Sequence, residues 1–71
     1  MNINIDEIKK LIKERFHNNQ TYFAYELNIN KSYLNTILTG KKINNSPKFL
    51  NNLIKYCKEN NLNYKNYIFF N

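Results

Sequence analysis

A short polar run in this chain has the residue types and the spacing of a surface that reads nucleic acid. Within residues 31–39, Leu34, Ile37 and Leu38 recur at the spacing of one helical face. The opposite face then carries polar side chains: Lys31, Ser32, Asn35, Thr36 and Thr39. Lysine can donate to guanine, asparagine can pair with adenine, and serine or threonine can serve either base. The pattern predicts hydrogen bonding to base edges in the major groove of duplex DNA.

The residues just before this run predict a second helix that holds it in place. Phe23, Ala24 and Leu27 share one helical face in a segment that starts at Gln20. Ala24 is small, which suits a point where two helices cross steeply and approach closely. We therefore expect a short helix from Gln20 that packs against the polar one.

Three residues connect the two expected helices, too few for another regular element. Asn28 can adopt the left-handed conformation that ends a helix, a role usually given to glycine. Asn30 can accept a hydrogen bond from the first free N–H groups of the following helix. Two short helices joined by a tight turn predict a helix-turn-helix.

The residues at the fixed positions of this stretch follow a known pattern: Gln20, Ala24, Leu27, Ile29, Leu34, Ile37 and Gly40. In this pattern the chain resembles the Cro/CI (Xre-type) helix-turn-helix family, the lambda-repressor-like DNA-binding proteins. The family's turn glycine is Asn28 here, and residues 46–69 look like the family's closing helices. The resemblance implies an all-α fold, a compact five-helix lambda-repressor-like domain with a central helix-turn-helix over residues 1–71.

The resemblance also implies roles for single residues. By analogy with the family, Gln20 would contact a phosphate or brace the residues that read bases. Lys41 and Lys42 follow the second helix and should reach the DNA backbone. The expected DNA-binding set is therefore Gln20, Asn30, Lys31, Ser32, Asn35, Thr36, Thr39, Lys41 and Lys42.

Helix signals also flank the central stretch. Asn4 can cap a helix over residues 5–16, and Glu7 can bond back to the Asn4 N–H. Asn19 can cap the helix from Gln20, and Ser46-Pro47 starts another that ends near residues 60–61. For the tail, a final helical turn over residues 64–68 and a strand over residues 64–70 stay open.

Composition limits what the chain can be. It has 71 residues, a formal net charge of +6 and a pI near 9.6, which favour a polyanionic partner, either nucleic acid or an acidic protein face. Paired carboxylates, glycine-rich phosphate loops and nucleophile–base sets are missing, so we expect no enzyme activity, cofactor or metal. Cys57 falls at an apolar position of its helix and is expected in the core. A single cysteine, with no membrane-spanning run or signal peptide, predicts a cytoplasmic protein.

The aromatic tail predicts an interface with a second copy. Tyr67, Ile68, Phe69 and Phe70 crowd apolar surface into the end of the chain, and two adjacent Phe side chains cannot both enter one small core. We expect these residues to form a homodimer interface. The alternative is a lid over the core of the monomer.

These observations lead to one functional interpretation and one rival. The first is a Cro- or repressor-like transcriptional regulator, from a phage or a low-GC bacterium, that reads an approximately palindromic operator as a dimer. No sensing domain is expected to follow it, and no small-molecule ligand. The rival is a protein-binding helix-turn-helix module such as an antirepressor, antitoxin or inhibitor, because Lys9, Lys10, Lys55 and Lys58 place charge outside the central stretch.

Overall fold

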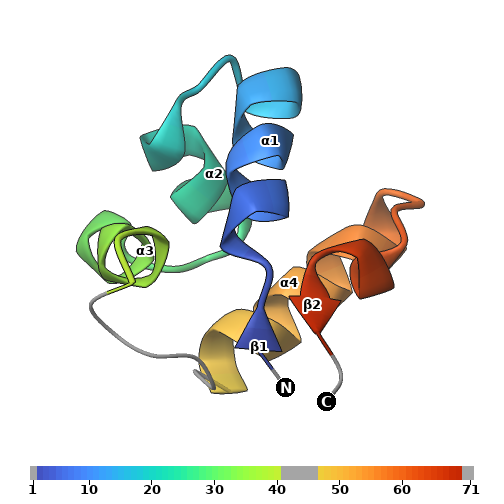
Figure 1. The fold of residues 1–71 in the computed structure, drawn as a ribbon. Coiled ribbons are helices and arrows are strands. Elements are labelled where there is room, and N and C mark those ends of the chain that lie inside the picture. Colours follow the sequence, from blue (N-terminus) through green and yellow to red (C-terminus); the bar gives the residue numbers. More distant parts are fainter. Residues whose placement is uncertain (1, 41–46, 70–71) are drawn as a thin grey trace.

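Helices make up most of the protein, as the all-α prediction requires. A computed structural model describes residues 2–40 and 47–69 (Figure 1). Along the chain the elements are β1 (Asn2–Ile3), α1 (Ile5–Phe16), α2 (Gln20–Glu26), α3 (Lys31–Leu38), α4 (Pro47–Glu59), the 3-10 helix η1 (Tyr64–Asn66) and β2 (Ile68–Phe69). None of the helices in these two ranges is both long and apolar enough to cross a bilayer.

The four α-helices lie where the sequence predicts them, but the tail differs. The expected final turn is a 3-10 helix of 3 residues, and the chain then becomes a short strand. The fifth helix is therefore not confirmed, because Ile68 pairs with Ile3 and does not continue a helical turn. Both of the alternatives left open for the tail are realised in part.

Asparagine side chains start the first three helices as predicted. The side-chain oxygens of Asn4, Asn19 and Asn30 accept backbone N–H groups of the following first turns, at 3.4, 3.1 and 2.7 Å. The predicted return bond from Glu7 to the N–H of Asn4 is wrong. That N–H donates to the carbonyl of Tyr67 at 2.9 Å, because β2 brings the tail beside the start of α1.

Left-handed backbone at the helix ends is supplied mostly by asparagine. Asn28 has φ 56° after α2, and Asn61 has φ 57° after α4. The prediction for Asn28 is thus confirmed: it adopts the left-handed conformation at the end of α2. Gly40, with φ 74°, plays the same part after α3.

One apolar cluster joins every helix. Leu34, Leu53 and Cys57 are fully buried, which confirms the core position predicted for the cysteine. Phe23 stacks edge-on against Phe16, with 5.2 Å between ring centroids. Burial of these side chains fixes which face of each helix turns outward.

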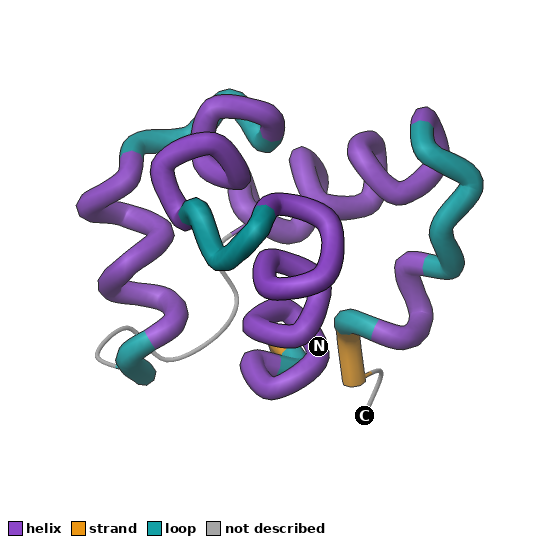
Figure 2. The backbone as a smooth tube through the Cα atoms, turned by 90° about the horizontal axis from the view of Figure 1, so that it is seen from above, coloured by secondary structure: helices purple, strands orange, loops and turns teal. Residues whose placement is uncertain are grey.

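The two ends of the chain close the molecule together. β1 and β2 pair antiparallel, with Asn2 opposite Phe69 and Ile3 opposite Ile68. In both views α3 lies on one side of α1, while η1 and β2 lie on the other (Figures 1 and 2). The polar helix α3 and the closing strand β2 therefore lie on opposite sides of α1.

Candidate nucleic-acid interface

The structure gathers the predicted reading residues on the outer face of α3. Lys31, Ser32, Asn35 and Thr39 are exposed, and Thr36 is half-buried. On the inner face the apolar side chains of α3 are buried, each with 4 % or less of its surface exposed: Leu34, Ile37 and Leu38. The core thus orients α3 so that its polar side chains turn outward.

Local hydrogen bonds decide what each threonine can still offer. The hydroxyl of Thr36 donates to the carbonyl of Ser32 at 2.9 Å, and that of Thr39 donates to the carbonyl of Asn35 at 2.9 Å. Because these hydroxyl protons are used in bonds to backbone carbonyls of α3, each threonine keeps only its methyl group and an acceptor oxygen for other contacts.

The other side chains of this face keep their donors. Within the described part of the chain, the side chains of Lys31, Ser32 and Asn35 have no hydrogen-bond partner. Asn30 differs, since its oxygen accepts from the N–H of Ser32 at 2.7 Å as the helix cap. The arrangement provides donors at the start and middle of α3 and acceptors beside them.

The remaining predicted contacts are spread over other places. Gln20 is the first residue of α2 and is half-buried. Lys41 and Lys42 lie outside the described residues. Further exposed cations lie on α1 and α4, among them Lys13 and Lys58. The positive charge of the described residues is consequently distributed over the surface and not concentrated on α3.

The expected dimer residues divide into core and surface. Ile68 is 3 % exposed and belongs to the core of the monomer, so its predicted place in an interface is corrected. The reason is the alternation of a strand, which turns Ile68 inward and Phe69 outward. Phe69 is 48 % exposed, Tyr67 is half-buried, and Phe70 lies outside the described residues.

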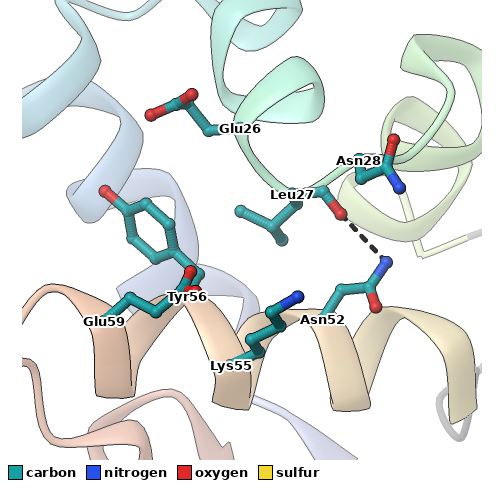
Figure 3. Close-up of a pocket in the computed structure, with 7 residues that line it drawn as sticks. All are labelled: Glu26, Leu27, Asn28, Asn52, Lys55, Tyr56 and Glu59. Atoms are coloured by element: carbon teal, nitrogen blue, oxygen red, sulfur yellow. Dashed lines mark hydrogen bonds between the residues drawn. The ribbon is translucent and has the colours of Figure 1, made fainter.

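Two features of the surface were missed at the sequence level. Tyr22 and Tyr25, one turn apart on α2, are 50 % and 77 % exposed. In the helical periodicity of α2, both tyrosines fall off the face that carries Phe23, Ala24 and Leu27, and this signal could have predicted their exposure. The second feature is Asn52 of α4, whose amide donates to the carbonyl of Leu27 at 2.9 Å (Figure 3). No local pattern marks that residue, because its partner is far away in the sequence.

The perturbed titrating groups lie in the core and not on α3. Burial raises the pKa of Tyr56, which the guanidinium of Arg15 partly offsets. Burial likewise raises the pKa of Cys57 and of Tyr67. All three groups are therefore neutral at neutral pH. Among the described residues no three His, Cys, Asp or Glu side chains gather where they could hold a metal ion.

Comparison of the chain with protein families, curated proteins and solved structures found no match. The likeness to the Cro/CI family accordingly rests on the residues of α2, the turn and α3 that carry it. A functional conclusion has to come from the chemistry of that surface.

Proposed function

We propose that this protein is a sequence-specific regulator of transcription that binds duplex DNA through α2 and α3. In this proposal the two helices and their turn are a helix-turn-helix, and α3 lies in the major groove. The observation that carries the proposal is the division of α3 into a buried apolar face and an outer face of hydrogen-bonding side chains. A solvated helix face needs no particular donors, whereas base reading does.

Each group on the outer face suits a particular partner on the bases. Lys31 would donate to the acceptors of guanine, and the amide of Asn35 would pair with adenine. Thr36 and Thr39, with their hydroxyl protons given to the helix, would accept from a base amino group or contact a thymine methyl. The free donors are thus on the side chains best suited to specific reading.

Attraction to the phosphate backbone would come from the basic balance of the chain. The net charge is +6, and Lys41 and Lys42 come just after Gly40 in the sequence. Neutralised phosphates release counterions, so the affinity should fall steeply as salt rises. Gln20, at the start of α2, is proposed to contact the backbone or brace the reading residues, as the family resemblance implies.

Binding as a dimer would double the number of bases read. Phe69 belongs to β2, which lies on the other side of α1 from α3 (Figure 1), and it exposes 48 % of its surface. Two copies joined there by a two-fold axis would present the same patch to each other. The proposal requires that this two-fold axis also set the two α3 helices about 34 Å apart, one turn of DNA, so that the pair reads an approximately palindromic site.

A selection experiment tests the proposal directly. The purified protein is incubated with a library of random duplexes at low salt, and the retained duplexes are sequenced over several rounds. We expect a two-fold symmetric motif, with affinity falling by orders of magnitude between low and moderately high salt. Retention of no sequence at low salt would refute base reading.

A protein partner is the second candidate, and one observation favours it. Tyr22 and Tyr25 expose large aromatic surfaces side by side on α2, and aromatic residues are enriched where proteins bind one another. Replacing both with serine separates the candidates. If DNA is the partner read by α3, the selected motif is unchanged. If the pair is the main binding surface, the variant loses its partner while α3 is intact.

A further inference from the structure

The end of α2 leaves the carbonyl of Leu27 without a partner in the helix. The N–H of Ile29 donates to the carbonyl of Ala24 at 2.9 Å, and the N–H of Asn28 donates to that of Tyr25 at 3.0 Å. With Asn28 left-handed, this pair of bonds is a Schellman motif. The carbonyl of Leu27 comes after both acceptors, so its partner must come from elsewhere.

That partner is the side chain of Asn52. Its amide nitrogen donates to the carbonyl of Leu27 at 2.9 Å, across 25 positions in the sequence (Figure 3). The asparagine caps of the helices, by contrast, bond two or three residues away. Asn52 is half-buried on α4, a helix that is itself fixed in the core through Leu53. The bond therefore attaches the turn before α3 to a rigid part of the molecule.

We infer that Asn52 is a positioning residue, which fixes the direction of α3 and thereby the base specificity of its outer face. Residues 27–30 alone separate the last residue of α2 from the first of α3. Rotation of the peptide after Leu27 would swing the start of α3, where Lys31 and Ser32 lie. The bond from Asn52 opposes that rotation. This inference rests on the proposed function, because it concerns the accuracy with which α3 is presented.

The space beside this bond allows Asn52 to be replaced in two ways that disturb the turn to different degrees. A pocket of about 110 Å³ opens next to it, with this lining: Glu26, Leu27, Asn28, Asn52, Lys55, Tyr56 and Glu59 (Figure 3). In Asn52→Ala, water from this pocket can reach the carbonyl of Leu27, so the fold should survive while the tie to α4 is lost. In Asn52→Asp, a carboxylate faces the carbonyl oxygen, and the turn is pushed away.

The test uses these two variants with matched controls at the neighbouring residue. Asn51 is exposed on the same helix, so Asn51→Ala and Asn51→Asp repeat the loss of side chain and the change of charge without touching the bond. Two quantities are measured for each folded protein. One is the carbonyl carbon chemical shift of Leu27, which reports the hydrogen bond. The other is the ratio of dissociation constants for a shuffled duplex and for the duplex that the wild type selects.

We expect the Leu27 shift to move in both Asn52 variants and in neither control. The discrimination ratio should fall about tenfold in Asn52→Ala, as for the net loss of one intramolecular hydrogen bond, and further in Asn52→Asp, where the carboxylate repels the carbonyl oxygen. The Asn51 variants should stay within about twofold of the wild type. Far-ultraviolet circular dichroism at the assay temperature establishes that each protein is folded.

The two hypotheses fail in different ways. If the wild type selects no sequence, the proposed function fails, and the reading role of Asn52 fails with it. If the wild type selects a motif and the Asn52 variants discriminate as well as the Asn51 controls, the DNA-binding function stands and the positioning role is overturned. An unmoved Leu27 shift in Asn52→Ala would also overturn it, since the bond would then be absent in solution.

Discussion

Two regions of the molecule, the α2–α3 pair and the closing end formed by β1 and β2, are held mainly by interactions that span different distances along the sequence. Between α2 and α3, the turn is shaped by neighbours in sequence: Asn28 supplies the left-handed backbone and Asn30 caps the next helix. At the closing end, β1 and β2 come from opposite ends of the chain, and Asn4 bonds to Tyr67. Local signals therefore shape the turn and start α3, with the bond from Asn52 to Leu27 as a long-range addition, while long-range pairing builds the proposed dimer end.

The largest expected effect is the loss of stability when Ile68, the buried residue of β2, is replaced. Ile68→Ala removes most of a side chain that is 3 % exposed, so the free energy of unfolding should fall by about 2–5 kcal/mol. Phe69→Ala is the matched control on the outer face of the same strand, and it should cost less than about 1 kcal/mol in the monomer.

Urea unfolding followed by circular dichroism measures both variants, and sedimentation measures their mass. If Phe69 forms the interface, Phe69→Ala should become monomeric while its monomer remains stable. Equal destabilisation by the two substitutions would mean that both side chains of β2 serve the core, and the dimer surface would have to lie elsewhere.

The second largest effect is expected in DNA binding, when side chains on the outer face of α3 are replaced. Asn35→Ala should reduce discrimination at one base pair of the selected duplex by about 1–3 kcal/mol, because it removes a bidentate partner of adenine. Lys42→Ala should lower the affinity for all sequences alike, since a phosphate contact carries no base information. Competition binding with single-base variants of the duplex separates the two patterns.

Asn51→Ala on α4 is the control for Asn35→Ala, because both residues are exposed asparagines on helices. It should leave discrimination unchanged. A uniform loss of affinity in Asn35→Ala would place this residue against the backbone and would contradict the proposed orientation of α3 in the groove.

The contrast between the two regions explains what the sequence could predict. The bounds of α1, α2 and α3 follow from side chains that act within a few residues, such as the cap of Asn19. The tail stayed open between a helical turn and a strand because the strand's partner, Ile3, lies at the other end of the chain. Asn52 was missed for the same reason. The outer face of α3 was predictable because the periodicity of one helix defines it. The contacts between β1 and β2 and between α4 and Leu27 were not predictable, because each joins two elements that are far apart in the sequence.

A smaller effect tests whether the turn between α2 and α3 is encoded locally. Asn28→Ala places an ordinary side chain at φ 56°, which should cost about 1 kcal/mol of unfolding free energy. Asn61→Ala meets nearly the same backbone, φ 57°, at the end of α4 and should cost about the same. A much greater loss at Asn28 in urea unfolding would show that its side chain has a further role in the turn.

The smallest effect at neutral pH is expected from two tyrosines, the buried Tyr56 and the half-buried Tyr67. Tyr56 lies against Phe16 and Phe23, with ring centroids 6.0 and 6.3 Å away, and Tyr67 directly precedes β2. Neither hydroxyl is charged at pH 7, so Tyr56→Phe and Tyr67→Phe should change the unfolding free energy little there.

At high pH, the titration of Tyr56 and Tyr67 should lower the free energy of unfolding. Burial raises the pKa of Tyr56 and of Tyr67 above the ordinary value of 10.0, so the folded state holds these protons more tightly than the unfolded state. Their contribution to stability is complete below the unfolded pKa and is lost as pH rises through the folded pKa. Burial also raises the pKa of the Cys57 thiol above 9.0. The loss of stability through this group therefore starts at a lower pH than the loss through the tyrosines.

Urea unfolding from about pH 8 to about pH 11 measures this loss, since the unfolded tyrosine and thiol titrate in that range. The wild type should lose stability steadily, and each Phe variant should lose less because one titrating group is gone. If Tyr56→Phe flattens the curve and Tyr67→Phe does not, Tyr67 is open to solvent, and the closing end separates before the helices unfold. Equal flattening would mean that the two regions, though held by interactions of different range, unfold as one unit.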